Sequence, residues 1–183
     1  MKNVTKRTFA PPTRAEVSPA NQAIFDKLQK GIGFVPNLYA YFAKSDTSLA
    51  DYLTFQSRRT SLTAKEKEIV NLVTSQINGC RYCLSAHTVI AIANGFTAEQ
   101  VMEIRLGTAA FDGKYNALAR LTASIVNNKG RVPENLLEGF FAAGYTEASL
   151  VDVIVAVGEK QISNYLHNLT NLEIDFPLAE EVA

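Results

Sequence analysis

The chain has 183 residues, of which 47% are hydrophobic and 20% are charged, and its formal net charge is zero. This length and composition suit one compact globular domain, and the balanced charge excludes the broad basic surface on which nucleic-acid binding relies. No apolar stretch approaches the roughly 20 residues that span a bilayer, so we expect a soluble, cytoplasmic protein.

The N-terminal third predicts an extended arm followed by short helices. Residues 1–17 contain a proline pair and are predicted to be extended. Ser18, with a proline behind it, is a typical N-cap and predicts a helix that ends near Gly33. Pro36 opens a second short helix, and a third is expected near 46–59.

A capping box marks the next helix. Thr63 is followed three residues later by Glu66, and the apolar positions behind them repeat with a helical period at Ile69, Leu72, Val73 and Ile77. An Asn-Gly pair ending in Gly79 breaks this helix. A further helix is predicted from Cys80 to about Asn94.

Capping residues and glycine stops predict four more helices, over residues 98–106, 113–128, 133–143 and 147–169. The last of these contains Val151–Val157, which is apolar nearly all round and is expected to be central or in a subunit contact. The tail, 170–183, is expected to be extended. Because strand patterns are nearly absent, the predicted fold class is all-α, a multi-helix bundle in a single domain over 1–183.

The residues that can carry chemistry gather at the start of the helix behind Gly79. Cys80 and Cys83 fall in its first turn, where unpaired N–H groups favour a thiolate. Helical positions three apart share one face and have Cα atoms about 5 Å apart, which is within disulfide range. His87 lies one turn further on the same face, where its imidazole can take a proton from Cys83.

Glu68 is the fourth candidate. If the two helices fold back on each other at Gly79, Glu68 and His87 differ by three residues in their distance from the turn, roughly 4.5 Å along the axis. One long side chain or one water can span that gap. A carboxylate there would orient His87 and stabilise its protonated form.

These residues, Glu68, then eleven residues, then Cys80-x-x-Cys83-x-x-x-His87, resemble the active-site signature of the alkylhydroperoxidase AhpD and carboxymuconolactone decarboxylase superfamily. The segments 33–37 and 164–168 resemble its peroxidase-related branch. The resemblance implies an AhpD-like all-α fold and a homo-oligomer, either a trimer or a hexamer.

The resemblance also implies a thiol-dependent peroxidase that reduces hydroperoxides. Cys83 would be the peroxidatic thiol and Cys80 the resolving thiol, while His87 and Glu68 would form the proton relay, through water. The disulfide would be reduced by an external dithiol, of the kind that a lipoylated adaptor protein supplies. No resident cofactor or metal is implied.

Other readings of the same residues stay open. Cys80, Cys83 and His87 offer three zinc-type ligands, although a structural zinc site needs a fourth. Two helical cysteines can also be inert packing. At the level of function, the alternatives are a decarboxylase-like acid–base enzyme of the same superfamily and a non-catalytic oligomer that uses the thiols as a redox switch.

A few further side chains have no settled role in the sequence. Tyr165, His167 and Asn168 are polar residues late in the last helix that either line a pocket or serve in capping and packing. Tyr82, between the cysteines, either shields the site or lies at its mouth. An aromatic group is assigned to the core or to a subunit interface: Phe34, Tyr39, Tyr41 and Phe42.

Overall fold

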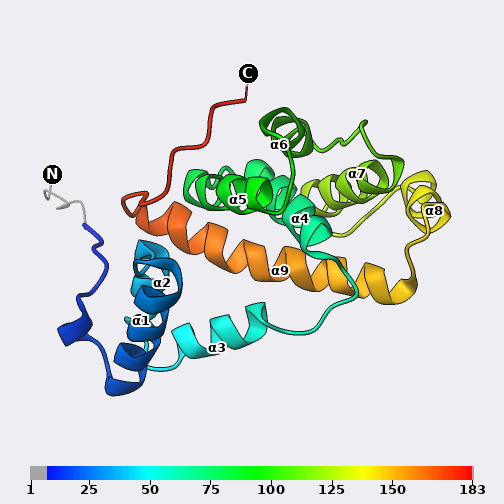
Figure 1. Cartoon of the computed structure of the whole chain (residues 1–183). Coiled ribbons are helices and arrows are strands. Elements are labelled where there is room, and N and C mark those ends of the chain that lie inside the picture. The colour runs from blue at the N-terminus through cyan, green and yellow to red at the C-terminus, as the bar shows by residue number, and fades with distance from the viewer. Residues whose placement is uncertain (1–7, 183) are drawn as a thin grey trace, which may run out of the picture. The chain divides into compact units, whose positions relative to one another are not determined.

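A computed structural model describes residues 8–182 of the chain. In this part every regular element is helical, and no strand occurs (Figure 1). The all-α prediction is therefore confirmed. The first seven residues of the predicted arm and residue 183 of the predicted tail lie outside the described residues.

The helices lie close to the predicted ranges. In chain order they are η1 (Arg14–Glu16, a 3-10 turn), α1 (Pro19–Ile32), α2 (Asn37–Phe42), α3 (Ser48–Gln56), α4 (Ala64–Ile77), α5 (Arg81–Ala93), α6 (Ala98–Arg105), α7 (Gly113–Asn127), α8 (Glu134–Ala142) and α9 (Glu147–Thr170).

The predicted capping residues do begin these helices. The Ser18 hydroxyl accepts a hydrogen bond from the Asn21 N–H, and Pro19 stands at the first position of α1. At α4 the Thr63 hydroxyl accepts from the Glu66 N–H at 3.2 Å, and the Glu66 carboxylate accepts from the Thr63 N–H at 2.8 Å. These reciprocal bonds satisfy donors that a helix N-terminus otherwise leaves unpaired.

One local expectation was wrong within the predicted arm. Residues 14–16 form the η1 turn instead of extended chain. The Glu16 carboxylate accepts hydrogen bonds from the Thr13 N–H at 2.7 Å and from the Thr13 hydroxyl at 2.8 Å. A capping box at Thr13 therefore stabilises a turn that the nearby prolines obscured.

The chain divides into two compact units, one formed by the segment up to Arg58 with Leu166–Asp175, the other by Arg59–Tyr165 with the segment from Phe176 onward. The prediction of a single domain over 1–183 stays a prediction. Each unit is described separately below.

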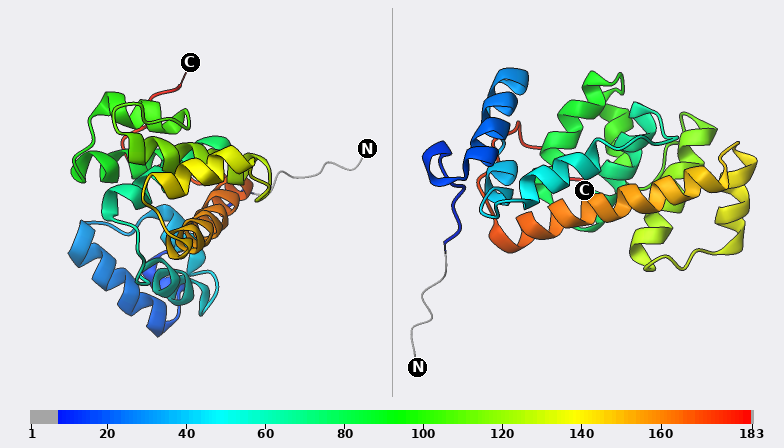
Figure 2. Two further views of the ribbon diagram at one scale, coloured as in Figure 1. Left: turned by 90° about the vertical axis from the view of Figure 1, so that its right-hand side faces the viewer. Right: turned by 90° about the horizontal axis from the view of Figure 1, so that it is seen from below.

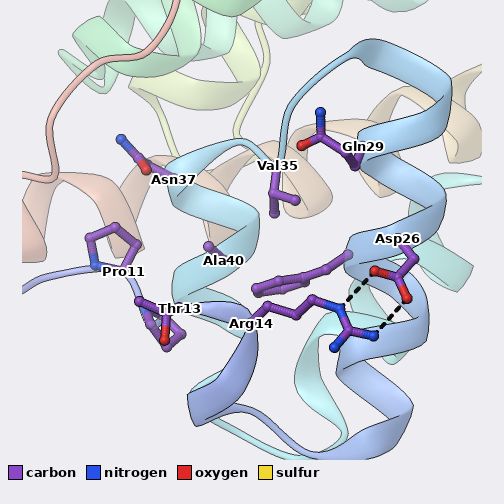
Figure 3. Close-up of a pocket in the computed structure, with 10 residues that line it drawn as sticks. Pro11, Thr13, Arg14, Asp26, Gln29, Val35, Asn37 and Ala40 are labelled. Carbon is purple, nitrogen blue, oxygen red and sulfur yellow. Dashed lines mark hydrogen bonds and ion pairs between the residues drawn. The ribbon is translucent and has the colours of Figure 1, made fainter.

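The first unit contains α1, α2 and α3. Phe42 is buried and stacks on Tyr52 with ring centroids 4.5 Å apart, so the predicted core role of the aromatic group is correct for Phe42. A surface pocket of about 370 Å³ lies beside the exposed Arg14–Asp26 ion pair of 2.8 Å (Figure 3). None of the residues predicted to carry chemistry lines this pocket.

The second unit is built around α4, which packs against α5, α6 and α7 (Figures 1 and 2). Four apolar residues of α4 are completely buried: Ile69, Val70, Leu72 and Val73. The continuous apolar core formed around them is the main source of stability available to the unit. The residues predicted to be catalytic all lie in this unit.

The segment Val151–Val157 of α9 is central on one face only. Val153, Ala156 and Val157 are buried in the core cluster of the second unit. Val151 and Ile154 are 61% and 46% exposed. The central placement is thus correct for the first face, and a subunit contact through the second face stays a prediction.

Within residues 8–182 no single helix is long and apolar enough to cross a bilayer. The pair of α8 and α9 taken together, bent by 116°, meets that requirement by length and composition.

Candidate thiol active site

The turn between α4 and α5 brings the site together. Gly79 has φ of +64°, a left-handed conformation that residues with a side chain rarely adopt. The Cys80 N–H donates to the Ser75 carbonyl at 2.9 Å, which closes the end of α4. The chain therefore reverses at Gly79, and α5 packs against α4 as predicted.

Cys80 is the N-cap of α5, and Cys83 is in its first turn. The Cys80 Sγ accepts from the Cys83 N–H at 3.4 Å, so a sulfur takes the usual place of a capping oxygen. The two Sγ atoms are 2.8 Å apart, both cysteines are free, and both are buried. This separation is longer than a disulfide bond of about 2.05 Å but close enough to become one with a small movement.

The two thiols differ in acidity. The hydrogen bond from the Cys80 thiol is the largest cause that lowers the pKa of Cys83 to about 6. Burial opposes this shift, and the nearby charges of Lys160 and His87 add to it. The pKa of Cys80 is raised, because its hydrogen bond to Cys83 and its burial both favour the neutral thiol. Cys83 is therefore the more acidic thiol of the pair, and Cys80 is the less acidic one.

Glu68 and His87 are in direct contact. The His87 Nδ1 is 2.7 Å from a carboxylate oxygen of Glu68, and the other oxygen accepts from the Asn71 amide at 3.0 Å. Burial raises the pKa of Glu68, but the charge and hydrogen bond of His87 and the charge of Lys160 outweigh it and lower the pKa overall. The lowered pKa favours the ionised carboxylate, which can accept from both the His87 Nδ1–H and the Asn71 amide.

Lys160, on α9, completes this group and was missed by the sequence analysis. Its Nζ lies 2.7 Å from the His87 Nε2, and the residue is only 2% exposed. Both ring nitrogens of His87 are thus engaged, one with Glu68 and one with Lys160. The predicted relay from Cys83 through His87 to Glu68 stays a prediction, and the contact between Glu68 and His87 is the part of it that the structure shows.

A signal for Lys160 was present in the sequence. It lies seven residues after Val153, which is two helical turns, and Val153 and Val157 mark the buried face of α9. The helical period therefore places Lys160 on the same buried face of α9 as Val153 and Val157.

Two further residues of α9 reach the cysteines and the turn. The Ser163 hydroxyl lies 3.9 Å from the Cys83 sulfur. The amide of Asn164 is fully buried and donates to the Ser75 hydroxyl at 3.2 Å, while its oxygen accepts from the Asn78 amide at 3.0 Å. Asn164 thus ties α9 to the end of α4, just before the Gly79 turn.

The residues left open in the sequence have packing or surface positions. Tyr82 is buried, and its ring meets Phe176 edge-on at 5.6 Å. His167 is buried, and its Nε2–H donates to the Leu172 carbonyl at 3.1 Å, which is a local capping contact. Tyr165 and Asn168 are exposed.

The zinc reading finds no support in the geometry. Among residues 8–182 no group of three or more His, Cys, Asp and Glu side chains could hold a metal ion. A neutral imidazole ligand needs a ring nitrogen free for the metal, whereas the two nitrogens of His87 contact Glu68 and Lys160.

Comparisons with known proteins agree with this fold. Residues 41–126 match the model of the carboxymuconolactone decarboxylase family. An AhpD-core, peroxidase-related protein from Ralstonia eutropha JMP134 is 19% identical with a TM-score of 0.79, over 97% of this chain and 96% of that one. A peroxidase-related protein from Silicibacter sp. TM1040 is 19% identical with a TM-score of 0.78, over 98% and 97%.

A protein with a different activity has a similar fold. The debrominase Bmp8 is 16% identical with a TM-score of 0.74, over 91% of each chain. No curated protein matches the chain by sequence.

Proposed function

We propose that the chain is a thiol-dependent peroxidase that reduces organic hydroperoxides. The match of residues 41–126 to the carboxymuconolactone decarboxylase family and the fold shared with peroxidase-related proteins support this proposal. The observation that carries the proposal is the pair of unequal thiols, Cys83 and Cys80, with sulfurs 2.8 Å apart at the start of α5. A thiolate beside a neutral thiol is the arrangement that a dithiol–disulfide cycle needs.

The proposed cycle has three balanced steps. The Cys83 thiolate attacks the terminal peroxide oxygen, so that an S–O bond forms, the O–O bond breaks, and the alkoxide takes up a proton to leave as an alcohol. Cys80 then attacks the sulfenic acid of Cys83, which forms the disulfide and releases hydroxide with the Cys80 proton as water. An external dithiol reduces the disulfide by exchange and is itself oxidised.

The low pKa of Cys83 supports its role as the peroxidatic thiol. A pKa of about 6 leaves most of this thiol ionised near neutral pH, and the thiolate is the nucleophilic form. The raised pKa of Cys80 keeps its proton available for the water that leaves in the second step. The contacts of each sulfur thus support the proposal that Cys83 is the peroxidatic thiol and Cys80 the resolving thiol.

The experiment is steady-state consumption of an organic hydroperoxide with an external dithiol as reductant. We expect Cys83→Ser to abolish turnover, and Cys80→Ser to allow one turnover and leave a sulfenic acid on Cys83, which intact mass detects. Ser124→Ala, on α7, is a control that leaves the thiol site intact and is expected to keep full activity. Full activity in both cysteine variants would refute the proposal.

Other activities in the same assay separate the alternatives. A protein that forms the Cys80–Cys83 disulfide with peroxide but does not turn over with any dithiol would be a redox switch. Release of carbon dioxide from a carboxymuconolactone, retained in the cysteine variants, would indicate an acid–base decarboxylase. A further structure of the debrominase contains 2,3,4-tribromopyrrole, so this compound is a second substrate to include. Its debromination without peroxide consumption would replace the peroxidase proposal.

A further inference from the structure

Lys160 is a buried cation in the middle of α9. It is 2% exposed, and the neighbouring Glu159 is 6% exposed, with an Nζ–carboxylate distance of 3.7 Å. An ammonium group that leaves water loses favourable hydration unless charged and hydrogen-bonding partners replace the water. A lysine in this position is therefore expected to have a purpose other than packing.

Its partner, His87, limits how protons are distributed. Because His87 Nδ1 contacts the Glu68 carboxylate, it carries a proton and donates it. In the neutral ring, Nε2 then accepts, and the Lys160 ammonium is the donor at 2.7 Å. Two cations at that distance would repel strongly, so the His87–Lys160 pair holds one positive charge between them.

We propose that Lys160 is a positioning residue of the thiol site, which fixes the orientation of His87 and supplies the positive charge that stabilises the Cys83 thiolate. This inference rests on the proposed peroxidase function and assigns the relay to three residues, Glu68, His87 and Lys160. The relay thereby ends in an ammonium group, in place of the imidazole that the sequence favoured.

The charged and titratable groups around Lys160 are consistent with this assignment. From α4 comes the Glu68 carboxylate, from α5 the His87 ring and the two thiols, and from α9 Glu159. The positive charge of Lys160 lowers the pKa of Cys83.

The relay also closes the proton balance of the reaction. When the O–O bond breaks, the alkoxide needs one proton, and the His87–Lys160 pair gives up the one that it holds. The external dithiol later brings two protons with two electrons. One proton stays on Cys80 as the thiol, and the other returns to the His87–Lys160 pair while Cys83 is released as the thiolate.

The test measures the pH dependence of Cys83 alkylation by iodoacetamide in the full-length reduced protein, with the modified residue located by mass. We expect Lys160→Met to raise the apparent pKa of Cys83 by about one unit, which lowers the alkylation rate roughly tenfold at acid pH. Lys160→Arg keeps the charge and is expected to restore most of the rate. Lys160→Gln can still donate to His87 but is neutral, so it should behave like Lys160→Met.

A matched control removes a different lysine. Lys65, at the start of α4, contacts the Gly95 carbonyl and the ring of Phe96, and Lys65→Met should leave the profile unchanged. A profile in Lys160→Met or Lys160→Gln that coincides with wild type would overturn the inference, as would failure of Lys160→Arg to exceed the neutral variants. Alkylation needs no peroxide, so the two proposals fail in different ways. A shifted pH profile without peroxide turnover would refute only the peroxidase function, whereas peroxide turnover with an unshifted profile would refute only the role of Lys160.

Discussion

The hydrogen bond between the two thiols gives the sharpest prediction. It is the largest of the contributions that lower the pKa of Cys83, ahead of the charges of Lys160 and His87. Removing the donor with Cys80→Ala should therefore make Cys83 a weaker acid while leaving its charged neighbours in place. Cys80→Ser keeps an O–H donor at the same position and is the matched control.

The expected magnitude follows from the strength of a hydrogen bond to a charged group. Such a bond contributes about 1.5–3 kcal/mol, and one pKa unit corresponds to about 1.36 kcal/mol, so the pKa of Cys83 should rise by roughly one to two units. Starting from a pKa of about 6, the thiolate fraction at pH 6 should then fall roughly 5- to 50-fold. The rate of Cys83 alkylation should fall by the same factor.

The assay is the alkylation rate of Cys83 as a function of pH, with thiolate absorbance in the ultraviolet as a second readout. In Cys80→Ser most of the acidity of Cys83 should be retained. If Cys80→Ala and wild type titrate together, the hydrogen bond is not what makes Cys83 acidic, and the assignment of unequal thiols is wrong. A shift of the same size in Cys80→Ser and Cys80→Ala would show that the sulfur itself, and not its donor proton, matters.

Two further predictions concern stability. The pKa of Glu68 in the folded protein lies below its usual value of 4.5, so its carboxylate stabilises the fold above that pH, and this stabilisation is lost as the pH falls through the lower folded pKa. Glu68→Gln should therefore show a smaller drop in Tm on acidification than wild type does. Equal drops in Tm would contradict this. At Gly79 an added Cβ meets no atom within 4 Å, so Gly79→Ala should lower the free energy of unfolding in urea only by the left-handed backbone penalty of about 1–2 kcal/mol. Gly31→Ala inside α1 should leave the free energy of unfolding unchanged or raise it. Equal effects of the two substitutions would refute the explanation that the turn at Gly79 is strained.

The helices were predictable because their signals are local. Thr63 with Glu66 forms the predicted capping box at the start of α4, and Thr97 with Gln100 forms a second one at the start of α6. Each box depends on hydrogen bonds between residues three apart, so no knowledge of packing is needed to find it. The turn at Arg14–Glu16 uses the same chemistry and was missed only because prolines precede it.

The part of the site that lies on α4, on α5 and in the turn between them was predictable. Cys80, Cys83 and His87 share a face of α5, and Glu68 reaches them because a single turn joins α4 to α5. Lys160 is 73 residues beyond His87, and its approach depends on how α9 packs in the second unit. Helical period indicates that Lys160 faces inward, but not which ring nitrogen it meets.

The contacts that make Cys83 acidic also bear on the return half of the cycle. The hydrogen bond from Cys80 and the charge of Lys160 stabilise a thiolate, and both interactions are lost when the two sulfurs join in a disulfide. Stabilising the thiolate therefore stabilises the reduced pair relative to the disulfide, which makes the disulfide easier for an external dithiol to reduce. A structural disulfide would instead need contacts that stabilise the disulfide relative to the reduced pair. The arrangement of Cys80, Cys83 and Lys160 thus favours a pair that is oxidised and reduced repeatedly over one that stays oxidised.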